Sequence, residues 1–296
     1  MNGIPRQRNE LHLFKRWYSH SKLVVLRKNP KRKRGGSRMK VDLVMWAKNG
    51  ERTLATVLNR INYAIPIKSV GQRLIVDDRS NDDTVQIAKA YNWRVILNEG
   101  CGISDGANTA LKHVETEYFA SFEQDVLLNW SWWTNITPLL KGKDVAVASG
   151  VRLPVFSKSL LKISEYSLEK ARRLDFPYFK TLDNTIYKTN AIKGLDGFPK
   201  TKMIVDTVLA KQIKDAGLKW IVDADTVSFH LKSLLDEVKS QYFYGKFSER
   251  TFLPKIAMRT AFSPIRGIEV AWKKKCWQVA FVYPILRLAH FLGVVD

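Results

Sequence analysis

Arg73-Leu74-Ile75-Val76-Asp77-Asp78 leads directly into Arg79-Ser80-Asn81-Asp82-Asp83-Thr84. A short apolar run that ends in two acids predicts a buried strand, and the Ser, Asn and Asp residues after it are typical of helix starts. Val85, Ala88 and Tyr91 then share one face of a helix. The stretch therefore predicts a strand followed by a helix, with two carboxylates at the carboxyl end of the strand.

Similar strand and helix patterns occur before and after this stretch. Apolar runs at 41–46, 94–97 and 118–122 predict three more strands, and apolar residues with helical spacing predict helices over 54–61 and over 104–114, the latter capped by Ser104. Strands that alternate with helices at these distances predict an α/β fold with a doubly wound, mostly parallel sheet. In such sheets ligands bind at the carboxyl ends of the strands.

Acidic residues follow two of the predicted strands. Asp77 and Asp78 close one strand, and Glu123 and Asp125 close another. Carboxylates after strands are also common as turn and cap residues, but two such pairs favour a site where Mg²⁺ or Mn²⁺ meets a phosphorylated ligand. The sequence has neither a G-x-x-x-x-G-K-[ST] loop nor a strand-linked G-x-G-x-x-G, which excludes P-loop and dinucleotide-binding proteins.

The chain is strongly basic, with 49 Lys and Arg against 28 Asp and Glu, a net charge of +21 and a pI near 9.9. Thirteen of the basic residues and one acid, Glu10, fall within residues 1–40. Residues 1–39 therefore predict a flexible basic arm. Whether the fold needs residues 1–38 is open, because Met39 directly precedes the first strand. The apolar run 23–26 is too short for a secretory signal, so a cytoplasmic location is expected.

Several segments, in order along the chain, resemble the motifs of one family. They are Leu43-Val44-Met45-Trp46-Ala47-Lys48-Asn49-Gly50-Glu51, Ile75-Val76-Asp77-Asp78-Arg79-Ser80, Asn98-Glu99-Gly100-Cys101-Gly102-Ile103-Ser104 with Asn108, Glu123-Gln124-Asp125, Asp183-Asn184-Thr185-Ile186-Tyr187 with Leu195-Asp196-Gly197-Phe198, and Val205-Asp206-Thr207. Through them the region 40–232 resembles the family 2 glycosyltransferases. The resemblance implies a GT-A fold with a nucleotide-binding half and an acceptor half, which residues 233–296 would extend with a helical segment.

The resemblance implies that a sugar passes from a nucleoside-diphosphate donor to an acceptor with inversion of configuration. Asp78 would contact the nucleobase, Asp125 would hold a divalent cation (Mg²⁺ or Mn²⁺) at the diphosphate, and Glu123 would lie near the ribose or the cation. Asp206 would be the general base, although its place also suits a first-turn helix acid. His230 matches a position that reaches the metal or the diphosphate, and a structural histidine is equally expected there.

Other site residues follow from their places in the matched segments. The residues predicted to contact substrate in this way are Ala47, Asn49, Glu51, Asp77, Ser104, Asn108, Gly197 and Phe198. The chain also departs from the family, because Ala107 replaces a common Arg and Val205 removes the first acid of a Glu-Asp pair. Asp125 and Asp206 are present, which favours an active enzyme over a catalytically silent sugar-nucleotide-binding relative.

Residues 233–296 lie beyond the resemblance and are aromatic and basic. The run 277–292 is nearly long enough to span a membrane, but Pro284, Arg287 and His290 interrupt it. It predicts a helix at the interface of an anionic membrane or, equally, a helix packed on the core. On the membrane hypothesis the protein binds peripherally at the cytoplasmic face, where a lipid-linked acceptor such as a polyprenyl phosphate would share its surface.

Two other function classes fit parts of the sequence. A nucleic-acid-binding protein would use the basic arm and the aromatic residues, but the chain has no RRM, KH, zinc-finger or helix-turn-helix signature, and acids at strand ends repel phosphates. A metal-dependent nucleotidyltransferase would use the same acids and release pyrophosphate. The matched segments favour the glycosyltransferase, whose expected partners are a nucleotide sugar and an acceptor and not nucleic acid.

Overall fold

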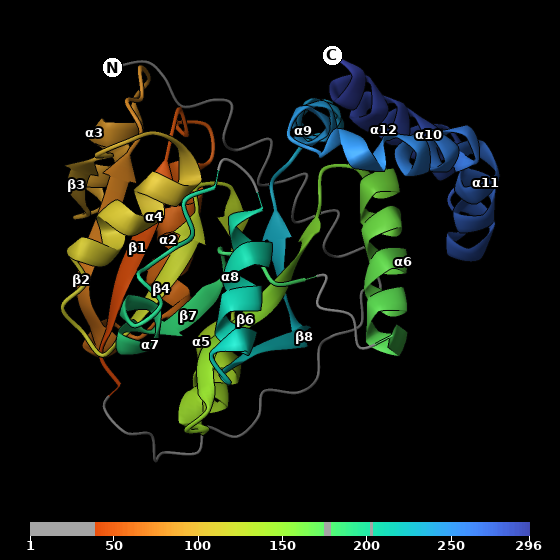
Figure 1. The fold of residues 1–296 in the computed structure, drawn as a ribbon. Helices are drawn as coiled ribbons and strands as arrows, with labels where there is room; N and C mark the ends of the chain where they lie inside the picture. Colours follow the sequence, from red (N-terminus) through yellow and green to blue (C-terminus); the bar gives the residue numbers. More distant parts are fainter. Residues whose placement is uncertain (1–38, 175–178, 202–203) are drawn as a thin grey trace. The chain divides into compact units, whose positions relative to one another are not determined.

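The computed structural model describes residues 39–174, 179–201 and 204–296, so the predicted arm lies almost entirely outside the described residues. Lys40–Asp296 form one compact unit. Its strands are β1 (Val41–Ala47), β2 (Val70–Asp77), β3 (Arg94–Leu97), β4 (Tyr118–Glu123), β5 (Val126–Leu127), β6 (Val145–Pro154), β7 (Thr185–Lys188) and β8 (Lys219–His230) (Figure 1).

Helices connect most of the strands up to β8, although β5 follows β4 directly, and the chain after β8 is helical. The helices are α2 (Leu54–Ala64), α3 (Thr84–Ala90), α4 (Gly102–Lys112), α5 (Trp132–Ile136), α6 (Lys158–Leu174), α7 (Thr189–Lys193), α8 (Val205–Asp215), α9 (Leu234–Lys246), α10 (Leu253–Ala261), α11 (Ser263–Lys274) and α12 (Gln278–Val295). Short 3₁₀ turns cover Ile67–Ser69, Thr137–Lys141 and Arg250–Phe252.

Eight strands of the described residues form one sheet in the order β3-β2-β1-β4-β7-β6-β8-β5. The pairs among β3, β2, β1 and β4 are parallel, as the strand and helix alternation predicted. The second half is mixed, because β7 runs antiparallel to both β4 and β6, β5 runs antiparallel to β8, and only β6 and β8 are parallel. The predicted α/β fold is confirmed, and its continuous run of parallel strands ends at β4.

Side chains of β1 alternate between two apolar layers, because successive residues of a strand point to opposite faces. Val44 and Trp46 pack in one cluster with Leu111 of α4 and residues of α8. Leu43 and Met45, which point the other way, are also buried. Both faces of β1 are therefore covered, and polar side chains gather at the carboxyl end of the strand.

The helix after β3 begins differently from the prediction. α4 starts at Gly102, where φ is +76°, and Cys101 occupies the N-cap position. Ser104 therefore lies inside the first turn, and its hydroxyl donates to the carbonyl of Pro199 at 2.7 Å instead of capping the helix. The prediction of a Ser104 cap was wrong because a loop distant in sequence takes the hydroxyl.

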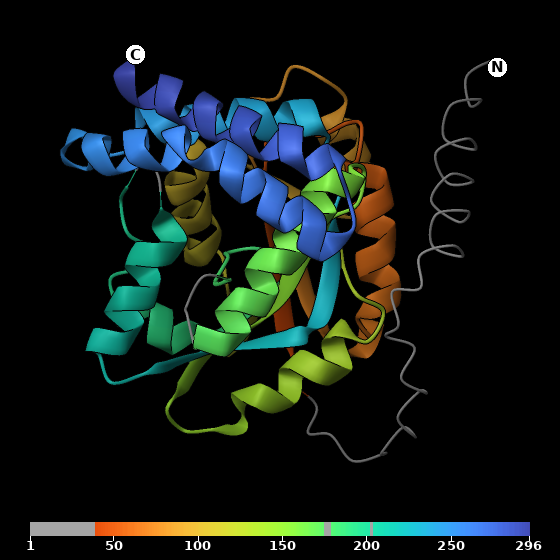
Figure 2. The same cartoon turned by 90° about the vertical axis from the view of Figure 1, so that its right-hand side faces the viewer.

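The C-terminal segment is helical, as predicted. α12 packs along α9 and α11 and also contacts α6 (Figure 2). α9 and α12 approach closely where Gly245 faces Gly293, since a Cβ on Gly293 would lie 1.9 Å from the carbonyl oxygen of Tyr242. By length and composition α12 could cross a membrane, and 33% of it is buried within the protein.

Candidate active site

Three ligand-type side chains meet at the ends of β4 and β8. Glu123 is the last residue of β4, His230 is the last of β8, and Asp125 lies between β4 and β5. The antiparallel pairing of Val126 with His230 brings them together. His230 Nε2 lies 3.0 Å from Asp125 Oδ2, and one ligand atom from each of the three residues lies within 4.8 Å of the other two.

This donor set fits a divalent cation. Two carboxylates and one imidazole offer oxygen and nitrogen ligands to Mn²⁺ or Mg²⁺, of which Mn²⁺ accepts nitrogen more readily. All three side chains are partly buried and partly open to solvent. A cation there could therefore keep coordination positions for a substrate oxygen.

Arg152, in β6, connects this group to a third carboxylate, that of Asp183, to which the matched motifs gave no role. Its guanidinium contacts Glu123 and lies 2.9 Å from Asp183 Oδ1. Asp183 is completely buried, and neither of its carboxylate oxygens accepts a hydrogen bond from the described residues. In the sequence, Arg152 could have been noticed as the one charged residue within the largely apolar run of β6.

The charges of this cluster shift its pKa values in opposite directions. Burial, with the nearby charges of Asp183 and Asp125, raises the pKa of Glu123 to about 8, and Arg152 opposes the rise. Burial also acts to raise the pKa of Asp125, but the hydrogen bond and charge of His230, with Arg152, outweigh it and lower that pKa. Several carboxylates share the Arg152 guanidinium, so an added cation would be attracted by the acidic groups that it leaves unneutralised.

Asp206 lies in the first turn of α8, next to the same cluster. The N-cap residue of α8, Ile204, has a left-handed backbone with φ of 56°. Burial and the charge of Asp183 raise the pKa of Asp206, while the Thr207 N–H and Arg152 oppose the rise. A partly buried carboxylate with a raised pKa is a suitable proton acceptor.

Asp77 and Asp78 lie at the carboxyl end of β2, as predicted, and have different surroundings. Asp77 is buried and accepts the Ser80 N–H through Oδ2, while its Oδ1 accepts no hydrogen bond from the described residues. Asp78 accepts from Asn98 Nδ2 and the Gly102 N–H, both at 3.2 Å. Its carboxylate also lies 3.5 Å from Lys48 Nζ and 3.5 Å from Arg79 Nη1, and both cations are exposed.

The loops after β1 and β2 are tied together by residues that were predicted to contact substrate. Asn49 Oδ1 accepts the Asn81 N–H at 3.0 Å, and Glu51 accepts the Asp83 N–H at 3.2 Å. The Ala47 carbonyl accepts the Asp78 N–H at 2.8 Å. These three residues therefore position the loop that carries Asp78, and a direct contact with substrate stays a prediction.

Ser104, Asn108, Gly197 and Phe198 form a separate clamp between α4 and the loop after α7. Asn108 accepts the Phe198 N–H at 2.8 Å and donates to the Phe198 carbonyl at 2.9 Å. Gly197 has φ of +87°, and a Cβ there would lie 2.4 Å from Asn108 Oδ1. The side chains of Asn108 and Ser104 bond within the clamp or to the Pro199 carbonyl, so the role of the clamp toward substrate also stays a prediction.

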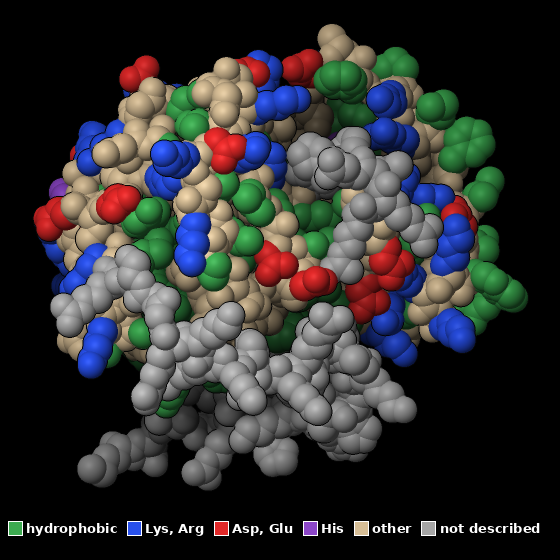
Figure 3. Space-filling view, turned by 90° about the horizontal axis from the view of Figure 1, so that it is seen from below, with side chains coloured by type: hydrophobic (Ala, Val, Ile, Leu, Met, Phe, Trp, Pro, Cys, Tyr) green, Lys and Arg blue, Asp and Glu red, His purple; other side chains and the backbone are tan. Residues whose placement is uncertain are grey.

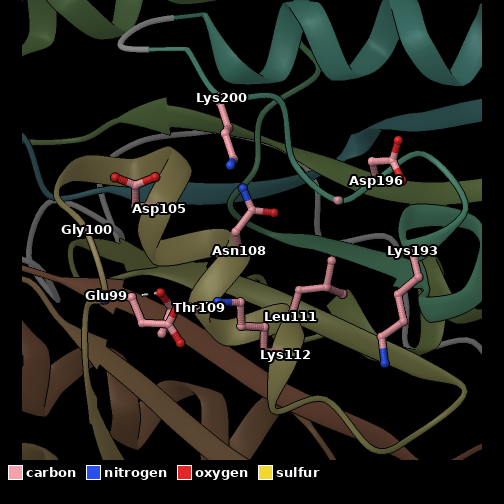
Figure 4. A pocket seen from close by; sticks show the side chains of 11 residues that line it. Glu99, Gly100, Asp105, Asn108, Thr109, Leu111, Lys112, Lys193, Asp196 and Lys200 are labelled. Atoms are coloured by element: carbon pink, nitrogen blue, oxygen red, sulfur yellow. Dashed lines mark hydrogen bonds and ion pairs between the residues drawn. The ribbon is translucent and has the colours of Figure 1, made fainter.

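A cavity of about 510 Å³ lies beside this clamp. Asn108 and Gly197 line it with Glu99, Lys112 and Lys200, and Figure 4 shows the Lys200 side chain pointing toward Asn108. Its lining includes none of the acids at the ends of β2 and β4. Glu123, Asp125 and His230 therefore lie outside this cavity.

The family model described as glycosyl transferase family 2 matches residues 42–196. No curated protein matches the chain significantly.

Solved structures with a similar fold have low sequence identity. Mannosyltransferase PcManGT from Pyrobaculum calidifontis, with GDP-Man and Mn²⁺, is 18% identical at a TM-score of 0.59, over 95% of this chain and 81% of that one. Glucosyl-3-phosphoglycerate synthase from Mycobacterium tuberculosis, with Mn²⁺, UDP and glucosyl-3-phosphoglycerate, is 17% identical at 0.54, over 72% and 81%. S. aureus TarS 1–349 is 21% identical at 0.54, over 69% and 64%.

Proposed function

The chain belongs to glycosyl transferase family 2, and on this premise we propose that it transfers a sugar, as a hexosyltransferase, from a nucleoside-diphosphate donor to an acceptor hydroxyl or lipid phosphate with inversion. The observation that carries the proposal is the meeting of Glu123, Asp125 and His230 at the strand ends. The loops beside it carry Asp78 and two exposed cations.

The donor would lie across the carboxyl ends of β1, β2 and β4. Asp78 would accept hydrogen bonds from the nucleobase, and its oxygens are held in place by Asn98 and the Gly102 N–H. Lys48 and Arg79 flank it and are exposed, so either can move to a phosphate oxygen. Two similar structures contain UDP or GDP-Man with Mn²⁺, which supports this donor class.

Asp125 and His230, with Glu123 beside them, would hold a Mn²⁺ or Mg²⁺ ion. When bound, the ion would neutralise charge on the departing diphosphate. Arg152 contacts Glu123 and would keep its carboxylate oriented toward the group. The donor's diphosphate would thus be placed between this group and the loop of Asp78.

Asp206 would deprotonate the acceptor. As the acceptor oxygen attacks the anomeric carbon, its proton passes to the Asp206 carboxylate, the bond from that carbon to the diphosphate oxygen breaks, and the nucleoside diphosphate leaves with the electron pair. One in-line displacement inverts the configuration and needs no covalent enzyme intermediate. The raised pKa of Asp206 makes it a stronger base than an exposed aspartate.

We further propose that residues 40–232 are the catalytic domain and that residues 233–296 bind the cytoplasmic face of an anionic membrane. The supporting observation is a set of apolar side chains that are each 46% to 74% exposed. We call this set the apolar face; it comprises Met258, Phe262, Ile265, Ile268, Trp272, Trp277, Phe281, Ile285, Leu288 and Leu292. In Figure 3 hydrophobic side chains project among Lys and Arg at the right-hand edge, where Figure 1 places α11.

Charge supports the choice of an anionic membrane. Residues 233–296 contain ten Lys and Arg against five Asp and Glu, and basic residues beside an apolar face favour anionic headgroups. Sedimentation with phosphatidylglycerol vesicles tests this proposal. Phe281→Ser with Trp272→Ser should reduce binding, whereas Tyr63→Ser, an exposed aromatic on α2, should not; equal binding of all variants would oppose the proposal.

Calorimetric binding of UDP, GDP and dTDP, with and without Mn²⁺, tests the transferase proposal. We expect one diphosphate to bind in a Mn²⁺-dependent way, and Asp125→Ala to lose that dependence. The control is Asp215→Ala, at an exposed acid of α8 that pairs with Lys211. A folded wild type that binds none of the three nucleotides would overturn the proposal.

A further inference from the structure

A second cavity, of about 430 Å³, lies between the sheet and the C-terminal helices. Its lining comes from the ends of β6 and β8, from α6, α9 and α12, and from Lys232. Figures 1 and 2 show α6, α9 and α12 close together at this end of the sheet. The volume is within the roughly 300–1,000 Å³ range of small-ligand pockets.

The inner end of this cavity reaches the proposed metal group. His230 and Arg152 both line it, and they contact Asp125 and Glu123 respectively. Tyr244 of α9 also lines it, close enough to Glu123 and Asp206 for their charges to act on its hydroxyl. A molecule in the cavity would therefore meet the donor at the reacting centre.

Arg287 gives the cavity a cation that no acid neutralises. Arg152 is paired with Glu123 and Asp183, and Lys232 is paired with Glu237 at 3.0 Å. Arg287 forms no ion pair within the described part of the chain; its guanidinium lies 5.3 Å from the Tyr283 ring centroid and donates to the Tyr283 hydroxyl at 3.4 Å. An unpaired, partly buried guanidinium favours an anion, above all a phosphate that it can bind in bidentate fashion.

Part of the wall is apolar, and Ser164, Gln241 and Tyr283 supply polar groups beside it. Leu160 and Ile163 of α6 face Leu286 of α12, and these residues belong to one hydrophobic cluster. α12 therefore contributes Leu286 and Arg287 to the cavity and Ile285 and Leu288 to the apolar face. A ligand held here would have an anionic head and an apolar body.

We propose that this cavity is the acceptor site and that the acceptor is a phosphate carried on an apolar chain, with the phosphate at Arg287 and Lys232 and the first part of the chain against Leu160, Ile163 and Leu286. The assignment of the cavity to the acceptor rests on the proposed transferase function. The ligand chemistry rests on the cavity alone. A longer apolar chain would continue from the cavity toward the membrane.

Calorimetric binding to the full chain tests the proposal with three probes that contain no nucleotide. Farnesyl phosphate, used below its micelle concentration, carries both features, farnesol lacks the phosphate, and glycerol 3-phosphate lacks the apolar chain. We expect farnesyl phosphate to bind, and the other two to bind at least about tenfold more weakly, because an ionic hydrogen-bonded contact and apolar burial each contribute that much.

Variants of Arg287 make the test specific. Arg287→Gln should weaken farnesyl phosphate binding by about 10- to 100-fold, Arg287→Lys should retain part of it, and Arg259→Gln, at an exposed cation on α10, should bind as the wild type. Unchanged binding by Arg287→Gln would overturn the proposal, as would glycerol 3-phosphate binding as tightly as farnesyl phosphate. Nucleotide binding measured in parallel keeps this result distinct from a failure of the transferase proposal.

Discussion

His230 Nε2 lies 3.0 Å from Asp125 Oδ2, across a sequence separation of 105 residues. The contact depends on a two-residue strand, β5, that pairs antiparallel with the end of β8. A backbone hydrogen bond also joins the two segments, because the Leu231 N–H donates to the Asp125 carbonyl at 2.8 Å. The position of His230 is thus fixed by the sheet and does not depend on a mobile loop.

Replacing His230 should weaken Mn²⁺ binding. If the proposed metal site is right, His230→Gln removes one nitrogen ligand and the hydrogen bond to Asp125, so we expect Mn²⁺ affinity to fall by about 10- to 100-fold or more. Electron paramagnetic resonance of free Mn²⁺ during a titration measures it. His113→Gln, which changes a histidine at the end of α4, should leave the affinity unchanged; equal losses in both variants would count against a metal role for His230.

Replacing Arg152 should destabilise the fold. Arg152→Met leaves Glu123 and the buried Asp183 without their common cation, and breaking a buried ion pair costs about 3–5 kcal/mol. The loss should shrink as the pH falls through the pKa of Glu123, about 8, because a protonated Glu123 no longer needs the guanidinium. Urea unfolding at two pH values measures both effects, with Arg250→Met at an exposed site as the control, and a loss below about 1 kcal/mol would contradict the prediction.

Much of the first half of the fold could be predicted from the sequence. Apolar runs with acids at their ends located β2 and β4, because a parallel strand is buried on both faces and turns polar where it leaves the sheet. Asp77, Asp78, Glu123 and Asp125 therefore lie at strand ends as expected. The local pattern carried this information because each strand and its helix are adjacent in the chain.

The second half could not be predicted in the same way. β7 inserts between β4 and β6 in antiparallel orientation, and no local pattern encodes which distant strand will be its neighbour. Arg152 and Asp183 meet only through that pairing, so neither received a role from the motifs. Ser104 was misassigned as a cap for a similar reason, since its acceptor Pro199 is 95 residues away.

Adding one methyl group at Gly293 should loosen the C-terminal helices. In Gly293→Ala the new Cβ would lie 1.9 Å from the Tyr242 carbonyl oxygen, so α9 and α12 must separate. We expect a net loss of about 1–3 kcal/mol from overpacking, even though Ala improves helix propensity by about 1 kcal/mol. Thermal unfolding measures it, and a variant more stable than the wild type would mean that the helices do not approach this closely.

The pKa of Asp206 should appear in the pH dependence of transfer to a hydroxyl. The base acts only when deprotonated, so kcat/KM should fall as the pH falls through the pKa of Asp206. Because burial and Asp183 raise that pKa, the acid limb should lie above the usual aspartate value of about 3.9. A profile of kcat/KM against pH measures it, and a limb at or below that value would contradict the prediction.

The cost of removing Asp206 should depend on the acceptor. A hydroxyl must lose its proton during attack, so Asp206→Asn should lower kcat by about 100- to 10,000-fold with such an acceptor. A phosphate monoester has its second pKa near about 6 and is already charged at pH 8, so the same variant should lose less than about tenfold with a polyprenyl phosphate. Asp215→Asn, which changes an exposed acid at the end of α8, serves as the control.

Rates with both acceptor types, measured at pH 8 and again near pH 5.5, separate the possible roles of Asp206. If it acts as a base, the penalty with the phosphate acceptor should grow at the lower pH, where the phosphate oxygen regains a proton. An equal penalty for both acceptors at both pH values would instead assign Asp206 to positioning. Its first-turn place in α8 beside Arg152 and Asp183 would then explain that penalty through the geometry of the charged cluster.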